Sequence, residues 1–248
     1  MKRRGIVLLP NLMTTANLFS GFYAVVSILS ANYLRAVIAI LVAILFDSLD
    51  GLLARYTKSS SRFGVEYDSL ADLISFGVAP GLLIYTWALN GYGRLGWVAA
   101  FLFVACGALR LARYNVQSAG MDGRYFTGLP IPAAAGLIAA TVLLDEYILR
   151  LGKEVRPIVI LVMTYLLALL MVSRLRYRKK LYLPNWRPFE LLVGAVLILM
   201  IFALFPQMTV FALFSGYALS GVLDRPVRAV MKKVRRPPLL EAEERRSQ

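Results

Sequence analysis

The sequence has no histidine and a single cysteine, Cys106. The first absence excludes imidazole as a general base or metal ligand, and the second excludes a disulfide within the chain. Charged residues are also scarce, at 17% of 248 residues, and basic residues outnumber acidic residues by 28 to 14. Such an excess often indicates nucleic-acid binding, but here the basic residues stand between apolar runs rather than on one soluble face. We therefore expect no nucleic-acid partner.

Apolar residues dominate the chain, at 59% of its length, and the mean hydropathy is +0.66. This composition is typical of a polytopic membrane protein rather than a soluble domain. A basic and then apolar stretch over 1–10 predicts a short helix lying on the membrane surface. After it, we predict an all-α bundle of about eight transmembrane helices, at residues 11–31, 34–56, 65–89, 94–114, 129–148, 156–173, 189–205 and 207–223.

The basic residues orient these predicted spans. If the N-terminus is cytoplasmic, most of the 28 Lys and Arg residues fall on the same side of the membrane. The exceptions are Arg35, Arg94, Arg150, Lys153 and Arg156. The bias predicts that both termini lie in the cytoplasm. We expect one membrane domain over 1–223 and a basic cytoplasmic tail over 224–248, partly disordered, that contacts anionic lipid headgroups or only sets the topology.

Four aspartates interrupt the apolar pattern. Asp47 and Asp50 share one face of the second predicted span, and Asp68 and Asp72 share one face of the third. A carboxylate at the centre of a membrane helix costs about 2.5–3.5 kcal/mol, so four would cost roughly 10 kcal/mol without compensation. One or two divalent cations would remove this cost, and oxygen ligands favour Mg²⁺, Mn²⁺ or Ca²⁺. The alternative is that the carboxylates meet water or basic side chains at the interface.

Small residues accompany the aspartates. Gly51 and Ala54 lie on the carboxylate face of the second span, and Gly64 lies on the third. Their lack of bulk would let a flat pyrimidine or a phosphate approach the backbone, although close helix packing explains them equally well. Arg55 at the helix end could bind a phosphate or extend to the interface.

Two arginines lie one turn apart in the predicted fourth span, at Arg110 and Arg113. Buried arginines favour bidentate binding of a carboxylate or a phosphate, so these residues could hold an acceptor substrate. Alternatively they are interfacial charges that set the topology. We expect Asn115 and the turn at 128–132 to shape the same pocket.

The aspartate region resembles the signature of the CDP-alcohol phosphotransferases at every fixed position, in the pattern D-x2-D-G-x2-A-R-x8-G-x3-D-x3-D. Three flanking segments resemble the membrane-embedded phosphatidylserine synthases of this family, namely LPNLMTTANLFSGFYA at 9–24, CGALRLARYN at 106–115 and FTGLPIPAAAG at 126–136. Ile131 departs from a serine that is common in that branch. The resemblance covers about the first two-thirds of the chain.

The resemblance implies an enzyme that transfers the phosphatidyl group of CDP-diacylglycerol to the hydroxyl of L-serine and releases CMP. It would be a homodimer embedded in the cell (inner) membrane, in contact with membrane lipids and with its active site facing the cytoplasm. Asp47, Asp50 and Asp68 would bind Mg²⁺ or Mn²⁺, and Asp72 would be a further ligand or the general base. The residues assigned to CDP are Asn11, Thr14, Asn17, Gly51, Ala54, Arg55 and Gly64. Arg110, Arg113 and Asn115 would bind the acceptor.

Other hypotheses remain open from the sequence. A sister enzyme would use glycerol 3-phosphate or inositol phosphate as the acceptor, and an archaetidylserine synthase would use an ether lipid. A divalent-cation transporter would use the carboxylates as an ion site, and a lipid-surface anchor would have no activity. For Asn11, Thr14 and Asn17, hydrogen bonding between helices is the alternative to contact with CDP, because polar groups in a membrane need partners away from water.

Overall fold

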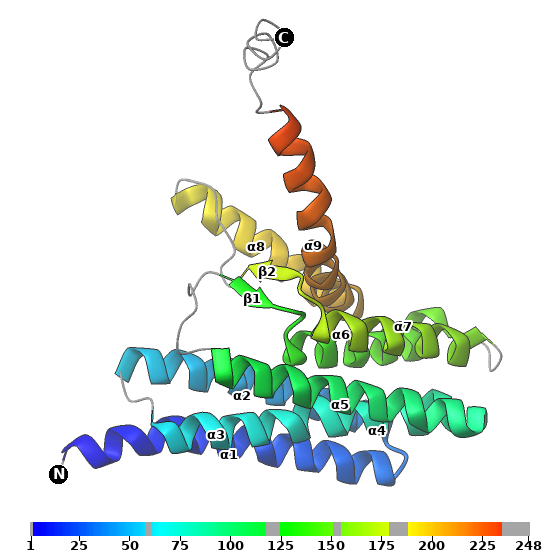
Figure 1. Cartoon of the computed structure of the whole chain (residues 1–248), viewed down its shortest axis with the longest axis horizontal. Coiled ribbons are helices and arrows are strands. Elements are labelled where there is room, and N and C mark those ends of the chain that lie inside the picture. Colours follow the sequence, from blue (N-terminus) through cyan, green and yellow to red (C-terminus); the bar gives the residue numbers. More distant parts are fainter. Residues whose placement is uncertain (1, 58–60, 118–124, 151–154, 179–187, 235–248) are drawn as a thin grey trace, which may run out of the picture.

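The computed structural model describes residues 2–57, 61–117, 125–150, 155–178 and 188–234. Helices make up almost all of this part, which confirms the predicted all-α class (Figure 1). A short antiparallel strand pair is the exception: in β1 (Tyr125–Thr127) and β2 (Arg176–Arg178), Phe126 is paired with Tyr177. The pair joins two loops outside the helical bundle.

The first two helices form a hairpin. They are α1 (Lys2–Leu29) and α2 (Tyr33–Thr57), joined by a tight turn in which Ala31 has a positive φ of 55°. Small side chains such as Ala24, Ala36 and Ala43 are fully buried, so the two helices pack closely. The sequence predicts a surface helix over 1–10 and a first span from residue 11. In the structure, α1 passes through Pro10 without a break and joins the two segments.

The helical run over 62–117 contains two arms, and Gly93 lies between them. The first arm consists of α3 (Arg62–Asp72), η1 (Leu73–Val78), α4 (Ala79–Ile84), η2 (Tyr85–Leu89) and η3 (Asn90–Tyr92). The wide η1 turn precedes Pro80, which has no N–H group to donate to the helix. Gly93, with φ of +52°, reverses the chain, and α5 (Gly93–Gln117) packs back against η1, α4 and η2.

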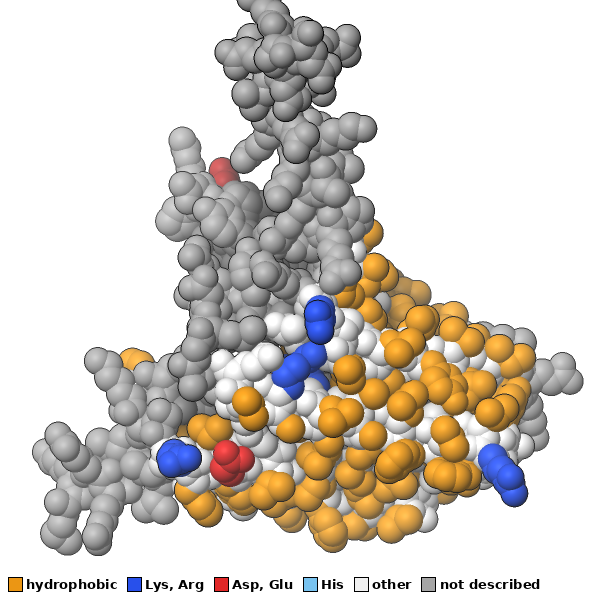
Figure 2. Space-filling model, in the orientation of Figure 1, with side chains coloured by type: hydrophobic (Ala, Val, Ile, Leu, Met, Phe, Trp, Pro, Cys, Tyr) orange, Lys and Arg blue, Asp and Glu red, His pale blue; other side chains and the backbone are white. Residues whose placement is uncertain are grey.

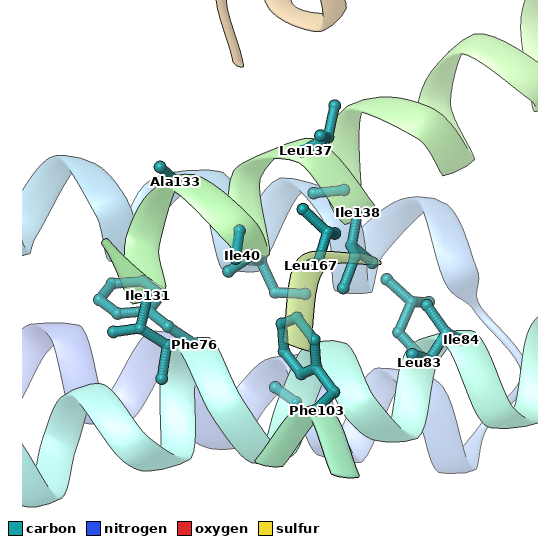
Figure 3. Close-up of a cluster of buried hydrophobic side chains, with 14 of the residues drawn as sticks. Ile40, Phe76, Leu83, Ile84, Phe103, Ile131, Ala133, Leu137, Ile138 and Leu167 are labelled. Carbon is teal, nitrogen blue, oxygen red and sulfur yellow. The ribbon is translucent and has the colours of Figure 1, made fainter. Parts of the chain in front are cut away.

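Helix α6 (Ile131–Leu144) occupies the centre of the bundle and contacts α2, α4, α5, α7 and α9. Figure 3 shows Ile131 and Ile138 of this helix near Ile40, Phe76 and Phe103, all of which are fully buried. The outer surface is also strongly apolar, with few charged side chains over the helical bundle in Figure 2. An apolar exterior around a packed core is the arrangement expected in lipid.

Four helical stretches of the described chain are long and apolar enough to cross a membrane, which identifies an integral membrane protein. They are Pro10–Leu29, Tyr33–Leu53, Arg62–Gln117 and Ile131–Leu149. The third stretch includes the reversal at Gly93 and so contains both spans that the sequence predicts at 65–89 and 94–114. The predicted total of eight spans and the orientation of the termini stay predictions.

The remaining helices lie on one side of this bundle (Figure 1). They are α7 (Val155–Val172), α8 (Pro188–Leu204) and α9 (Pro206–Val234), whereas η4 (Asp145–Leu149) continues α6 in the fourth stretch. Helices α8 and α9 bend by 120° at the break that the sequence predicts around Phe205. The expected basic tail begins as the helical end of α9, and residues 235–248 lie outside the described part.

Arg113 of α5 holds the turn before α6 against the end of α7. Its guanidinium donates to the carbonyl oxygens of Val172 at 2.9 Å, Thr127 at 3.0 Å and Met171 at 3.1 Å. A cation at a helix C-terminus is favourable because carbonyl groups there lack partners in the helix. The adjacent Gly128 has φ of +82°, and a Cβ atom there would lie 2.1 Å from the Met171 oxygen.

We expect Gly128→Ala to lower the thermal unfolding midpoint of the protein in detergent. A left-handed backbone costs a residue with a Cβ about 1–2 kcal/mol, and the clash with Met171 adds to this cost. Gly216→Ala is the matched control, because a Cβ at Gly216 in α9 meets no heavy atom within 4 Å. Equal midpoints for the two variants would contradict this description of the turn.

Candidate metal centre

Three aspartates from two helices converge at one end of the bundle. One carboxylate oxygen each from Asp47, Asp50 and Asp68 lies within 4.8 Å of the other two. Asp50 is buried and the other two are half-buried, so water screens their charges poorly. Within the described part of the chain, Oδ1 of Asp68 is buried and accepts no hydrogen bond. Clustered carboxylates with an unsatisfied buried oxygen fit the preferences of a divalent cation.

Asp72 lies one helical turn after Asp68 and is 8% exposed. It is not one of the three aspartates that approach within 4.8 Å of one another. Its carboxylate nevertheless interacts with that of Asp47, and all four aspartates line one cavity of about 500 Å³. The sequence prediction that two helices bring four carboxylates to one site therefore agrees with the geometry.

Helix α5 contributes Arg110, Leu111, Tyr114 and Asn115 to the lining of the cavity. Arg110 is 6% exposed and interacts electrostatically with Asp72. The side-chain amide of Asn115 donates to the Ser69 hydroxyl at 2.9 Å, which connects α5 to α3. The cavity of about 500 Å³ therefore combines four carboxylates with a buried guanidinium.

The turn before α6 completes the wall with Pro130 and Pro132, in the segment that the sequence indicates. Arg113 is different, because it does not line the cavity and donates to backbone carbonyls instead. Of the three residues predicted to bind the acceptor, the structure thus brings Arg110 and Asn115 to the cavity and places Arg113 behind it. The half-buried Arg113 instead hydrogen-bonds to the turn and to the end of α7.

The polar residues of α1 also lie behind the cavity wall. The Thr14 hydroxyl donates to Oδ2 of Asp50 at 3.1 Å, and the Asn17 amide donates to Oδ1 of Asp72 at 3.0 Å. Asn11 lies close to Gly64 of α3, because a Cβ atom added at Gly64 would be 3.2 Å from Oδ1 of Asn11. For Thr14 and Asn17, the structure therefore shows the hydrogen bonding between helices that the sequence left as an alternative.

The predicted small residues differ in their surroundings. Gly51 lines the cavity, and a Cβ atom there would meet no heavy atom within 4 Å, so it leaves space beside the carboxylates. Gly64 lies in a tight first turn, where its N–H donates to the capping hydroxyl of Ser61 at 3.0 Å. The side chains of Ala54 and Arg55 fall outside the described residues, so their predicted contacts with CDP stay predictions.

Sequence reasoning missed Ser48, Ser69 and Tyr114 on the cavity wall. Helical spacing carries a signal for Tyr114, which is four residues after Arg110 and so lies on the same face of α5. The two serines adjoin aspartates in the sequence, but a serine next to a charged residue is too common to indicate a site.

Comparison with known proteins agrees with this geometry. A family model described as CDP-alcohol phosphatidyltransferase matches residues 7–172. A CDP-diacylglycerol–serine O-phosphatidyltransferase of Helicobacter pylori strain 26695 is 38% identical over 197 residues, which are 79% of this chain and 80% of that protein. A protein of the same name from Methanocaldococcus jannaschii is 36% identical over 177 residues, 71% of this chain and 76% of its own.

An archaetidylserine synthase of Methanothermobacter thermautotrophicus is 42% identical over 148 residues, 59% of this chain and 62% of that protein. The family model covers well over half of the sequence and includes every aspartate of the site. The chain therefore belongs to the CDP-alcohol phosphatidyltransferase family and is a transferase.

Proposed function

We propose that this enzyme transfers the phosphatidyl group of CDP-diacylglycerol to the hydroxyl of L-serine and releases CMP. The observation that carries the proposal is the cavity in which four carboxylates face a buried arginine, in a chain whose relatives act on serine according to their names. Membership of a transferase family disfavours a cation transporter or an inert lipid anchor. The cavity would open to the cytoplasmic side of the cell (inner) membrane, following the distribution of basic residues.

The acidic wall supports a divalent cation as the cofactor. We assign Asp47, Asp50 and Asp68 to it, because their oxygens are mutually close and Asp68 has an unsatisfied buried oxygen. Carboxylate ligands favour Mg²⁺ or Mn²⁺, Ca²⁺ would also be accepted, and a second ion would require Asp72 as a further ligand. When bound, the ion would neutralise the charge of the pyrophosphate during transfer.

We assign different cavity residues to the two substrates. The open space at Gly51 favours the CDP moiety beside the carboxylates, and the family resemblance adds Ala54, Arg55, Gly64 and Asn11 to the CDP contacts. Arg110 would bind the carboxylate of serine through paired N–H groups. Asn115 would support the acceptor.

We assign the general base to Asp72, following the family resemblance. The serine oxygen would form a bond to the phosphorus that carries the diacylglycerol, and the bond between this phosphorus and the oxygen of CMP would break. The proton of the serine hydroxyl would pass to the Asp72 carboxylate, which lines the same cavity as the acidic cluster and Arg110. The alternative is that Asp72 serves only as a ligand.

Two finer points belong to the proposal. The archaetidylserine synthase among the relatives makes an ether lipid the second candidate for the donor, with the acceptor unchanged. The family resemblance also implies a homodimer, and this stays a prediction. Neither point changes the residues assigned to the reaction.

We expect purified enzyme to release CMP from CDP-diacylglycerol with L-serine and Mn²⁺, and not with glycerol 3-phosphate or inositol phosphate. Asp68→Asn should reduce this rate at least about 100-fold, since it removes a charged oxygen from the metal site. Glu146→Gln is the matched control, because it also removes one carboxylate but lies exposed in η4. Full activity of Asp68→Asn, or a preference for a phosphorylated acceptor, would contradict the proposal.

Arg110→Ala should raise the KM for L-serine at least about tenfold, which is the effect of losing a charge-assisted hydrogen bond of roughly 1.5–3 kcal/mol. The KM for CDP-diacylglycerol should change little. Steady-state kinetics with each substrate varied in turn separates the two values. An equal increase for both substrates would contradict the assignment of Arg110 to the acceptor.

A further inference from the structure

Two polar side chains of α1 contact the carboxylates from behind the cavity. Thr14 is 4% exposed and Asn17 is fully buried, and neither lines the cavity. The Thr14 hydroxyl lies 3.1 Å from Oδ2 of Asp50 and 3.2 Å from the carbonyl oxygen of Pro10. The carboxylate is the stronger acceptor of the two because it is charged. Both side chains therefore act on the aspartates rather than on the space that a substrate would fill.

The position of Asn17 is fixed by close packing of α1 against η1. The Ser75 hydroxyl donates to the backbone oxygen of Asn17 at 3.0 Å. Gly21, one turn later, lies so close to η1 that a Cβ atom would be 2.1 Å from the Ser75 hydroxyl. The Asn17 amide nitrogen donates to Asp72, whereas Oδ1 has no hydrogen-bond partner among the described residues. The contact with Asp72 therefore determines the orientation of this amide.

The two hydrogen bonds reach carboxylates with different surroundings. Asp50 belongs to the three aspartates whose oxygens lie within 4.8 Å of one another, and Asp72 does not. A hydrogen bond to one oxygen restricts the rotation of a carboxylate and directs its other oxygen. Thr14 donates to Oδ2 of Asp50, and Asn17 donates to Oδ1 of Asp72. Each bond therefore restricts one carboxylate of the site, Thr14 within the close group of three and Asn17 outside it.

Building on the proposed function, we propose that Thr14 and Asn17 are positioning residues with separate tasks. Thr14 orients Asp50 toward the divalent cation, and Asn17 orients Asp72 toward the serine hydroxyl. This assignment replaces the contact with CDP that the family resemblance implies for both residues. It predicts that substitutions only three positions apart on one helix change different measurable properties.

The test for Thr14 is the affinity of the purified enzyme for Mn²⁺ without substrate, measured by electron paramagnetic resonance of the free ion. Thr14→Val should weaken binding about 10-fold or more, the usual effect of losing a partner of a metal ligand, and Thr14→Ser should restore it. Thr15→Val is the matched control, since the exposed Thr15 hydroxyl contacts the Asn11 carbonyl at 2.8 Å and the Tyr67 hydroxyl at 3.0 Å and no aspartate of the site. Equal affinity of Thr14→Val and Thr15→Val would overturn the role of Thr14.

The test for Asn17 compares Mn²⁺ affinity with steady-state kinetics. Asn17→Leu should keep Mn²⁺ affinity within about twofold while kcat falls at least about tenfold, the lower range for losing a supporting hydrogen bond. Ser20→Ala is the control, because this buried hydroxyl donates only along α1, to Ala16 at 2.9 Å. Asn17→Ser provides a second variant if Asn17→Leu does not fold. An increase in the KM for CDP-diacylglycerol with unchanged kcat would show direct contact with CDP and overturn the role of Asn17.

The same titrations separate this inference from the proposed function. If wild-type enzyme binds Mn²⁺ and all α1 variants bind and turn over equally, the positioning roles fail while the proposed function stands. If wild-type enzyme binds no divalent cation, the metal site of the proposed function fails, and the role of Thr14 fails with it.

Discussion

The convergence of aspartates from α2 and α3 is the constraint on which the rest of the structure depends. Asp47 and Asp50 come from one helix and Asp68 and Asp72 from the next, and all four line one cavity. Together with Arg110 they give a formal charge of −3 in a bundle that is otherwise apolar. Such a concentration of charge is costly without a compensating cation, because water screens these buried and half-buried groups poorly.

The surrounding fold keeps these helices in register. Gly21 lets α1 approach η1 closely, and the bonds from Thr14 and Asn17 connect α1 to both acidic helices. Behind α5, Arg113 joins the turn before α6 to the end of α7 and so supports the far wall of the cavity. Polar groups inside the helical bundle need hydrogen-bond partners, because an unsatisfied group there would be costly. Here these hydrogen bonds fix the positions of the helices around the cavity.

The acidic site could be predicted from the sequence because helical spacing places residues three and four apart on one face. The distribution of basic residues predicted that Arg110 and the aspartates lie on the same side of the membrane. It could not distinguish Arg110 from Arg113, because the difference depends on where α7 ends in space. The roles of Thr14 and Asn17 were hidden for the same reason, since each contacts a residue 36 or 55 positions away. The strand pair between two loops likewise depends on tertiary contacts rather than on local propensity.

The most direct measurement is anomalous diffraction from crystals of the enzyme grown with Mn²⁺. We expect an anomalous peak between the carboxylates of Asp47, Asp50 and Asp68, with the four aspartate side chains facing one cavity. Crystals in which these side chains point apart, or in which Mn²⁺ binds elsewhere and leaves the acidic cluster empty, would contradict the account.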